Sequence, residues 1–250
     1  MEKTTIETFI KKYNLNGLVE QVRWVVKDKT LRVTAITPDK KFLDSVTLKS
    51  FNALPDSVIG IIGTVTLKQL LGALEKDVTL TLVPADDDPN RIISLIIDDG
   101  KSEVQHMCGG LEAIANEPVI KKLPTEYDIE IVLTNEFKER FLNAKAALSD
   151  QKLFTVLNNK KKKCLELVVG YNRNVSNRIS VPITVSTTSK STTIKEPISF
   201  NSSNLKEILS ANSESSDPIL KISELGMATI EFDTPEFQSK YYMIKIDIED

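Results

Sequence analysis

The side chains that most often carry out chemistry are sparse in this 250-residue chain. His106 is the single histidine, so histidine-rich zinc sites are excluded and acid-base schemes built on histidine have little support. The run GIIGTVTLK at 60–68 comes nearest to a nucleotide-binding loop, but it lacks the Gly-Lys-Ser/Thr ending that such a loop requires. We therefore expect no catalytic centre and no cofactor.

Carboxylates gather in the run ADDDPN (Ala85–Asn90), where they could bind a divalent cation. Asp, Pro and Asn are also the residues that form turns, and we interpret the run as a solvated hairpin turn. Cys108 and Cys164 lie in strand-like contexts in different halves, with no further cysteine or histidine at metal-ligand spacing. We interpret both as buried free thiols and His106 as a packed strand residue, and we expect no metal site.

A seven-residue phrase occurs twice in the chain. LKQLLGA at Leu67–Ala73 returns as LKEILSA at Leu205–Ala211, a little more than half the chain later. Both copies space their apolar residues as a helix does when it packs one face on a core. Strand-like runs separated by polar turns follow each copy. The repeat therefore predicts two copies of one domain.

The apolar periodicity along the rest of the chain predicts an α+β fold. In each half a helix is followed by several strands, a second helix and several more strands. We predict helices at 4–14, 67–73, 135–148 and 205–211, and strands at 19–26, 30–37, 42–48, 57–63, 78–83, 91–97, 102–107, 127–133, 152–157, 164–171, 178–185, 196–200, 219–222, 228–232 and 241–246. Pro182 lies inside one of these strands and indicates an edge or a bulge, because proline cannot donate to a ladder.

The segment GGLEAIANEPVIKKLPT (Gly109–Thr125) has no clean period and contains two glycines and two prolines. We interpret it as a connector. The predicted organisation is an N-terminal domain at 1–110, a connector at 111–125 and a C-terminal domain at 126–250.

Each predicted helix buries an apolar stripe and carries basic residues that we expect on the outer face. These are Lys11, Lys12, Lys68, Lys76, Lys138, Arg140, Lys145 and Lys206. The net charge of −3 argues against a protein that coats nucleic acid by bulk attraction. A basic surface made by the helices could still contact phosphates without reading sequence. The alternative is an ordinary solvated helix face, and glutamates on the same helices keep that alternative open.

No run approaches the roughly eighteen consecutive apolar residues that a membrane-spanning helix needs. The first fourteen residues are too charged for a signal peptide. We expect an intracellular, cytoplasmic protein.

The most specific pattern lies near the C-terminus, in FNSSNLKEILSA (200–211), LKISELGMATIEF (220–232) and YYMIKI (241–246). A helix, a strand, a Gly-Met turn, a strand and a last strand with tyrosine near its start follow in this order. Together with the repeat, this pattern resembles the two-domain DNA sliding clamps, the family of proliferating cell nuclear antigen and the processivity clamps of T4-like bacteriophages. DSVIGII (56–62) is similar to phage clamps and favours a bacteriophage source, hence the host cytoplasm.

The resemblance implies a processivity factor for DNA replication. Two tandem domains, each with antiparallel sheets and two inner helices, would close as a homotrimer into a ring around duplex DNA. The expected partners are a DNA polymerase, a clamp-loader ATPase and, as in the T4-like group, transcription machinery.

The resemblance also implies two protein-binding surfaces. A pocket for partner peptides would be formed by Val119, Ile120, Leu123, Met227, Tyr241, Tyr242 and Ile244. Ring closure would pair the strands at 102–108 and 178–185, which places Val104, His106, Cys108, Ile179 and Val181 at the subunit interface. Pro182 puts the register of that pairing in doubt, because it would cost the ladder a hydrogen bond.

Two other functions fit the same residues. One is a structural virion or scaffold protein built from duplicated β-rich domains, for which the basic helix faces would be incidental. The other is a processivity factor of this fold that acts as a monomer or dimer without closing. The mass of the protein in solution distinguishes the trimer from both.

Overall fold

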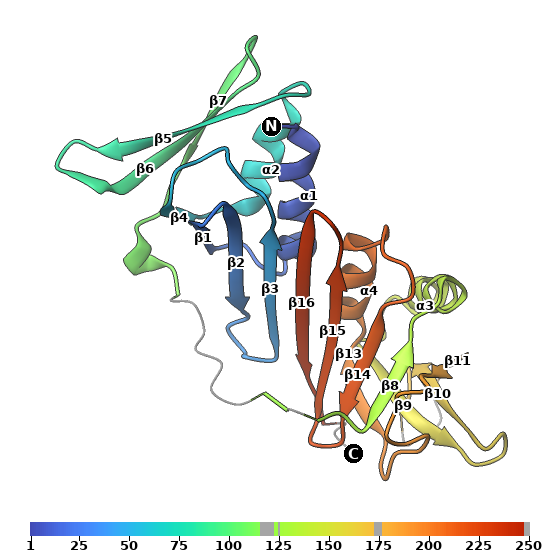
Figure 1. Ribbon diagram of the computed structural model, residues 1–250. Coiled ribbons are helices and arrows are strands. Elements are labelled where there is room, and N and C mark those ends of the chain that lie inside the picture. The colour runs from blue at the N-terminus through green and yellow to red at the C-terminus, as the bar shows by residue number, and fades with distance from the viewer. Residues whose placement is uncertain (116–122, 125, 173–176, 248–250) are drawn as a thin grey trace. The chain divides into compact units, whose positions relative to one another are not determined.

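The computed structural model describes residues 1–115, 123–124, 126–172 and 177–247. The chain divides into two compact units (Figure 1). Unit 1 comprises Met1–Val119 together with Asp233–Ser239, and unit 2 comprises Ile120–Phe232 together with Lys240–Asp250.

Unit 1 contains two α-helices, two short 3₁₀ turns and two antiparallel sheets. Its elements are α1 (Lys3–Asn14), η1 (Leu15–Gly17), β1 (Val22–Lys27), β2 (Thr30–Ile36), β3 (Phe42–Leu48), β4 (Ser57–Ile61), α2 (Thr64–Gly72), β5 (Thr79–Ala85), β6 (Asp88–Asp98), β7 (Glu103–Met107) and η2 (Leu111–Ala113). One sheet has the order β4-β1-β2-β3 and the other β5-β6-β7. The core centres on Trp24, whose ring meets Phe9 edge-on and whose indole N–H donates to the Tyr13 hydroxyl over 3.2 Å.

Unit 2 repeats this plan. Its elements are β8 (Ile129–Val132), α3 (Asn135–Ala147), β9 (Leu153–Asn159), β10 (Cys164–Val169), β11 (Ile179–Pro182), β12 (Thr184–Val185), β13 (Ile198–Asn201), α4 (Ser202–Ala211), β14 (Ile219–Ser223), β15 (Met227–Asp233) and β16 (Phe237–Ile244). One sheet has the order β12-β8-β14-β15-β16 and the other β11-β10-β9-β13. The turn between β15 and β16 belongs to unit 1.

The two copies of the repeated phrase form corresponding helices, α2 and α4, as predicted. Leu67 and Leu71 are buried in α2, and Leu205, Ile208 and Leu209 are buried in α4. Within each unit the two α-helices contact each other, α1 with α2 and α3 with α4. The repeat therefore positions two neighbouring helices beside the sheets of each unit.

The helices of unit 2 begin where polar side chains satisfy free backbone N–H groups. The Asn201 side chain accepts from the N–H groups of Ser203 and Asn204 at the start of α4, over 2.8 and 3.1 Å. Thr134 accepts from the Phe137 N–H at the start of α3. Such caps are typical of Asn and Thr, and they fix where each helix begins.

The strand predicted at 178–185 is wrong as a single element. It divides at Pro182 into β11, which pairs with β10, and β12, which pairs with β8 in the other sheet. Proline has no N–H to continue a ladder, so the chain leaves the first sheet where Pro182 lies opposite Glu166. The edge position that Pro182 predicts is confirmed, because β11 is the outermost strand of its sheet.

The acidic run at 85–90 forms the turn of the β5–β6 hairpin, as predicted. Asp87 makes an ion pair with Arg91 over 2.5 Å, and the Asp88 carboxylate accepts from the Asn90 N–H over 2.9 Å. These local contacts order a solvated turn.

The cysteines are free thiols, but the burial predicted for them is wrong. Cys108 is half-buried and Cys164 is exposed. Cys164 begins β10 directly after an exposed turn and lies opposite Asn159, at the end of the β9–β10 ladder.

Among the described residues, none of the helices combines the length and the apolar character that a membrane crossing requires.

Candidate nucleic-acid-binding surface

The lysine in the second position of each repeated phrase is exposed. Lys68 lies on α2 and Lys206 on α4, each next to a fully buried leucine, Leu67 or Leu205. The Lys206 ammonium lies 3.1 Å from the carboxylate of Glu207. An exposed pair of this kind contributes little to stability, so the ammonium remains available to an anion in solution.

Three further basic residues of the predicted surface are also exposed, namely Lys11, Lys76 and Arg140. The Arg140 guanidinium donates to Glu136, one helical turn earlier on α3, over 2.7 Å. Each unit therefore presents exposed cations on its helices or at their ends.

The exposure predicted for Lys12, Lys138 and Lys145 is wrong. The Lys138 ammonium donates to the Ser215 carbonyl over 2.9 Å, and the Lys145 ammonium donates to the Ser149 and Gln151 carbonyls over 2.6 and 2.9 Å. Lys12 is 1% exposed. Long lysine stems lie along apolar surface while the ammonium groups of Lys138 and Lys145 donate to backbone carbonyls, so these two lysines stabilise the fold.

The ammonium of Lys12 lies over an aromatic ring, that of Phe237, 5.2 Å from its centroid. The quadrupole of the ring attracts the charge and helps to offset the loss of water around it.

Two positive charges lie close together on the helices of unit 2. Burial lowers the pKa of Lys145, and the positive charge of Lys206 on α4 lowers the pKa further. Asp150 opposes both effects.

Replacing Lys145 should separate its structural contribution from that of its exposed neighbour. We expect Lys145→Met to lower the free energy of unfolding by about 1–3 kcal/mol, because the carbonyls that it satisfies lose a buried donor. Lys206→Met, at the exposed site, should change it by less than about 0.5 kcal/mol. Urea unfolding followed by circular dichroism measures both, and equal effects would contradict the assignment.

The strands predicted to close a ring both lie at sheet edges. β7 is outermost in the order β5-β6-β7, and β11 is outermost in the order β11-β10-β9-β13. Of the interface residues predicted on or beside these strands, Val104, Cys108 and Ile179 are half-buried, whereas His106 and Val181 are buried.

His106 is a packed strand residue, as predicted. It is 4% exposed, and within the described part of the chain its Nε2 atom has no hydrogen-bond partner. Burial lowers the pKa of His106, while a hydrogen bond with the Ile62 backbone acts in the opposite direction. A neutral imidazole turned into the unit cannot supply polar contacts at the edge of β7.

The residues predicted to form a peptide pocket differ in exposure. Val119 and Ile120 lie outside the described residues. Leu123, Met227 and Ile244 are half-buried, and Tyr242 is 5% exposed. Tyr241 is fully buried, and its hydroxyl accepts from the Asn212 side chain over 3.0 Å, so its side chain packs inside unit 2.

Comparisons with known proteins find a similar structure but no protein that is similar in sequence. No family model and no curated protein matches the chain in sequence. The crystal structure of proliferating cellular nuclear antigen from Entamoeba histolytica is similar to this chain, with a TM-score of 0.69 over 98% of this chain and 96% of that one. The two sequences are 15% identical. The chain has the sliding-clamp fold.

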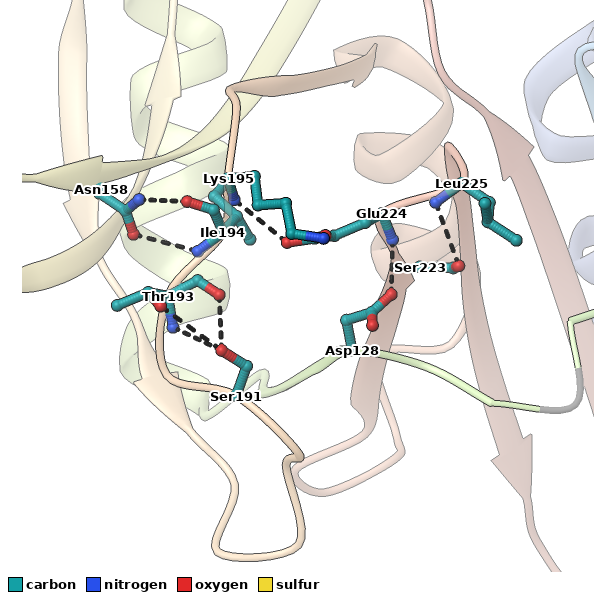
Figure 2. Close-up of polar contacts among 9 residues, drawn as sticks. All are labelled: Asp128, Asn158, Ser191, Thr193, Ile194, Lys195, Ser223, Glu224 and Leu225. Atoms are coloured by element: carbon teal, nitrogen blue, oxygen red, sulfur yellow. Dashed lines mark hydrogen bonds and ion pairs between the residues drawn. The ribbon is translucent and has the colours of Figure 1, made fainter.

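Within this clamp fold, the turn between β14 and β15 is braced from several sides (Figure 2). The Glu224 N–H donates to the Asp128 carboxylate over 2.7 Å, and the Lys195 ammonium lies 3.1 Å from the Glu224 carboxylate. The Leu225 N–H donates to the Ser223 hydroxyl over 3.3 Å. The turn holds Leu225 outward with 87% of its surface exposed.

Beside this turn is an open cleft of about 580 Å³. Its lining includes Lys195, Glu224, Lys245 and Ile246.

Sequence reasoning missed two exposed apolar residues of the clamp fold. Met107, on the edge strand β7, is 59% exposed, and Leu225 is 87% exposed. The exposure of Met107 could have been predicted from the sequence. It alternates with His106 along the strand, so a buried histidine places the methionine on the outer face.

Proposed function

We propose that this protein is a sliding clamp that encircles duplex DNA and tethers a DNA polymerase during replication. One observation carries the proposal: the clamp fold extends over 98% of the chain. The neighbouring structure is, by its name, a proliferating cellular nuclear antigen, and its fold supports the same activity here. The exposed cations on both helix pairs supply the chemistry for holding a polyanion.

The proposed mechanism needs only weak contacts with DNA. A closed ring stays on DNA because it is linked to it, and tight or base-specific contacts would stop it from sliding. Lys68, Lys206, Lys11 and Lys76 would contact phosphates and release counterions, each changing the salt slope of log K by roughly 0.9. Trp24, the single tryptophan, is buried and takes no part in base stacking.

We propose that the ring is a homotrimer closed by pairing β7 of one subunit with β11 of the next. Both strands end their sheets, so each presents unpaired N–H and C=O groups to a partner strand. Met107 would be covered in the closed ring, which accounts for an apolar side chain that is 59% exposed in the single chain.

The mass in solution tests this assembly. We expect a species at three times 27.9 kDa in light scattering at micromolar concentration. Met107→Asp should shift it toward the monomer, because the closed ring would then bury a charge where it covers Met107. Leu225→Asp is the matched control at another exposed apolar position and should leave the trimer intact. A monomer for the unmodified chain would exclude the trimer.

We further propose that polymerase, clamp-loader and transcription proteins, as in the T4-like phage clamps, dock through short apolar peptides. Leu123, Met227, Tyr242 and Ile244 would form the described part of the pocket. Leu225 would also be covered by a bound partner. Burying its side chain would contribute about 1.5–3 kcal/mol to binding.

A further inference from the structure

The hairpin formed by β9 and β10 extends beyond the strands on either side of it (Figure 1). Its ladder continues to the pair Asn159–Cys164. On one side β13 stops opposite Val156, and on the other side β11 stops opposite Glu166. The tip of the hairpin, residues 157–165, therefore projects from the four-stranded sheet as two strands alone.

The tip carries four consecutive lysines, Lys160–Lys163, and all four are exposed. The Asn159 side chain accepts from the N–H groups of Lys161 and Lys162, each over 3.0 Å. Asn158 braces the base of the tip by exchanging hydrogen bonds with the backbone of Ile194 (Figure 2). An ordered backbone thus presents four ammonium groups at one end of unit 2.

One of the four lysines anchors the tip. The Lys162 ammonium lies 2.8 Å from the carboxylate of Glu166, whose side chain is 6% exposed. Burial by itself would raise the pKa of Glu166, but hydrogen bonds from Lys162, Asn159 and Ser180 outweigh it, so the pKa lies below its usual value. Within the described part of the chain, no carboxylate forms an ion pair with the other three lysines.

We propose that the tetralysine tip, Lys160–Lys163, binds the phosphate backbone of duplex nucleic acid. Its charge is concentrated in four residues of a chain whose net charge is −3, so the attraction is local. Lysine binds phosphate as a point charge and needs no base contact.

The composition of the tip favours duplex nucleic acid over the other polyanions. Protein interfaces are depleted in lysine and rely on aromatic and arginine anchors, whereas the exposed residues of the tip are four lysines and Cys164. Single strands are bound by stacking bases on aromatic rings, and the tip has none. Contact with phosphates alone matches the chemistry that is present.

The proposal goes beyond the clamp function, because neither the helix pairs nor ring closure enters it. It is tested with a variant that reverses three charges, Lys160→Glu/Lys161→Glu/Lys163→Glu, and leaves Lys162 on its carboxylate. The matched control is Lys29→Glu/Lys40→Glu/Lys41→Glu, which makes the same change in net charge at exposed turn lysines of unit 1. Circular dichroism checks that both variants fold.

Fluorescence anisotropy with a short linear duplex, repeated over a salt series, is the measurement. The tip variant should bind about tenfold more weakly or worse at low salt, and the slope of log K against log salt should fall in magnitude by about 2–3, roughly 0.9 per lysine. The control should keep most of the affinity and slope. Equal losses in both variants, or no loss in the tip variant, would overturn the proposal.

Two competitors separate the classes of ligand. A single-stranded oligonucleotide and a polyglutamate peptide are each titrated against the labelled duplex. We expect the duplex to be displaced only by unlabelled duplex at comparable phosphate concentration. Stronger displacement by polyglutamate would assign the tip to acidic proteins instead. A linear duplex cannot hold a ring topologically, so this result does not depend on whether the clamp proposal holds.

Discussion

Lys68→Glu/Lys206→Glu is expected to fold normally and to be retained on circular duplex DNA at least about tenfold more weakly than the unmodified protein. Both side chains are exposed, and both stand beside a buried leucine of the repeated phrase. Reversing their charge removes two phosphate contacts per subunit and adds repulsion. If subunits form a trimer, the change is multiplied by three around the ring.

The control for this variant is Lys29→Glu/Lys41→Glu, which changes net charge equally at turns of unit 1. Retention is measured by gel filtration of labelled protein on a plasmid, and folding by thermal unfolding. The helix faces are wrongly assigned to DNA if both variants are retained equally. A loss of folded structure is not expected, because charged substitutions at exposed sites usually change stability by less than about 0.5 kcal/mol.

Asp44 should make the stability of the protein fall as pH rises. It lies on the buried face of β3 between Phe42 and Val46, with 0% of its surface exposed. Among the residues that the structure describes, neither carboxylate oxygen has a hydrogen-bond partner of ordinary geometry. Burial raises the pKa of Asp44 well above its ordinary 3.8, and the nearby N–H groups of Asp44 and Ala35 offset only part of this effect.

The sign of the pH dependence follows from the proton count. Between the ordinary pKa and the raised folded pKa, the folded chain holds a proton on Asp44 that the unfolded chain has released. Stability therefore declines across that window and levels off above the folded pKa. Asp44→Asn should flatten the decline, and Asp44→Val should raise the free energy of unfolding at neutral pH by about 1–3 kcal/mol, because it removes a buried carboxyl whose burial is only partly offset.

Urea unfolding at a series of pH values checks this prediction. Asp39→Asn is the control with the opposite sign, because a hydrogen bond from the Thr37 hydroxyl, and a second from the Lys41 N–H, lower the pKa of Asp39. Asp39 contributes stability above its ordinary pKa, and that contribution is lost as pH falls through its lowered pKa. An unchanged pH profile for Asp44→Asn would contradict the account of this carboxyl.

The sequence predicted the elements of this fold well because apolar periodicity is a local signal. The stripe in LKQLLGA and LKEILSA identified α2 and α4, and the duplicated phrase revealed two related halves before any strand pairing was known. Pro182 marked an edge correctly. It did not reveal that the chain changes sheets there, since that depends on β8, far away in sequence.

The exposure predicted for Lys138 and Lys145 was wrong because burial depends on residues distant in sequence. Lys138, Arg140 and Lys145 lie on the same amphipathic helix. The Lys138 ammonium donates to the Ser215 carbonyl, and the Lys145 ammonium donates to carbonyls in the turn after α3. Nothing in the spacing of α3 distinguishes the three. Tyr241 and Tyr242 are adjacent, and the Asn212 side chain, bound to the Tyr241 hydroxyl, is contributed from beyond the end of α4.

The measurement that tests the central proposal most directly is retention on closed and cut DNA. The protein is assembled on a circular plasmid, by a clamp loader or by raising subunit concentration, separated from free protein, and the plasmid is then cut once with a restriction enzyme. A sliding clamp remains on the closed circle and is lost from the free ends after the cut. Equal retention on the closed and cut DNA would show ordinary binding and contradict the proposed ring.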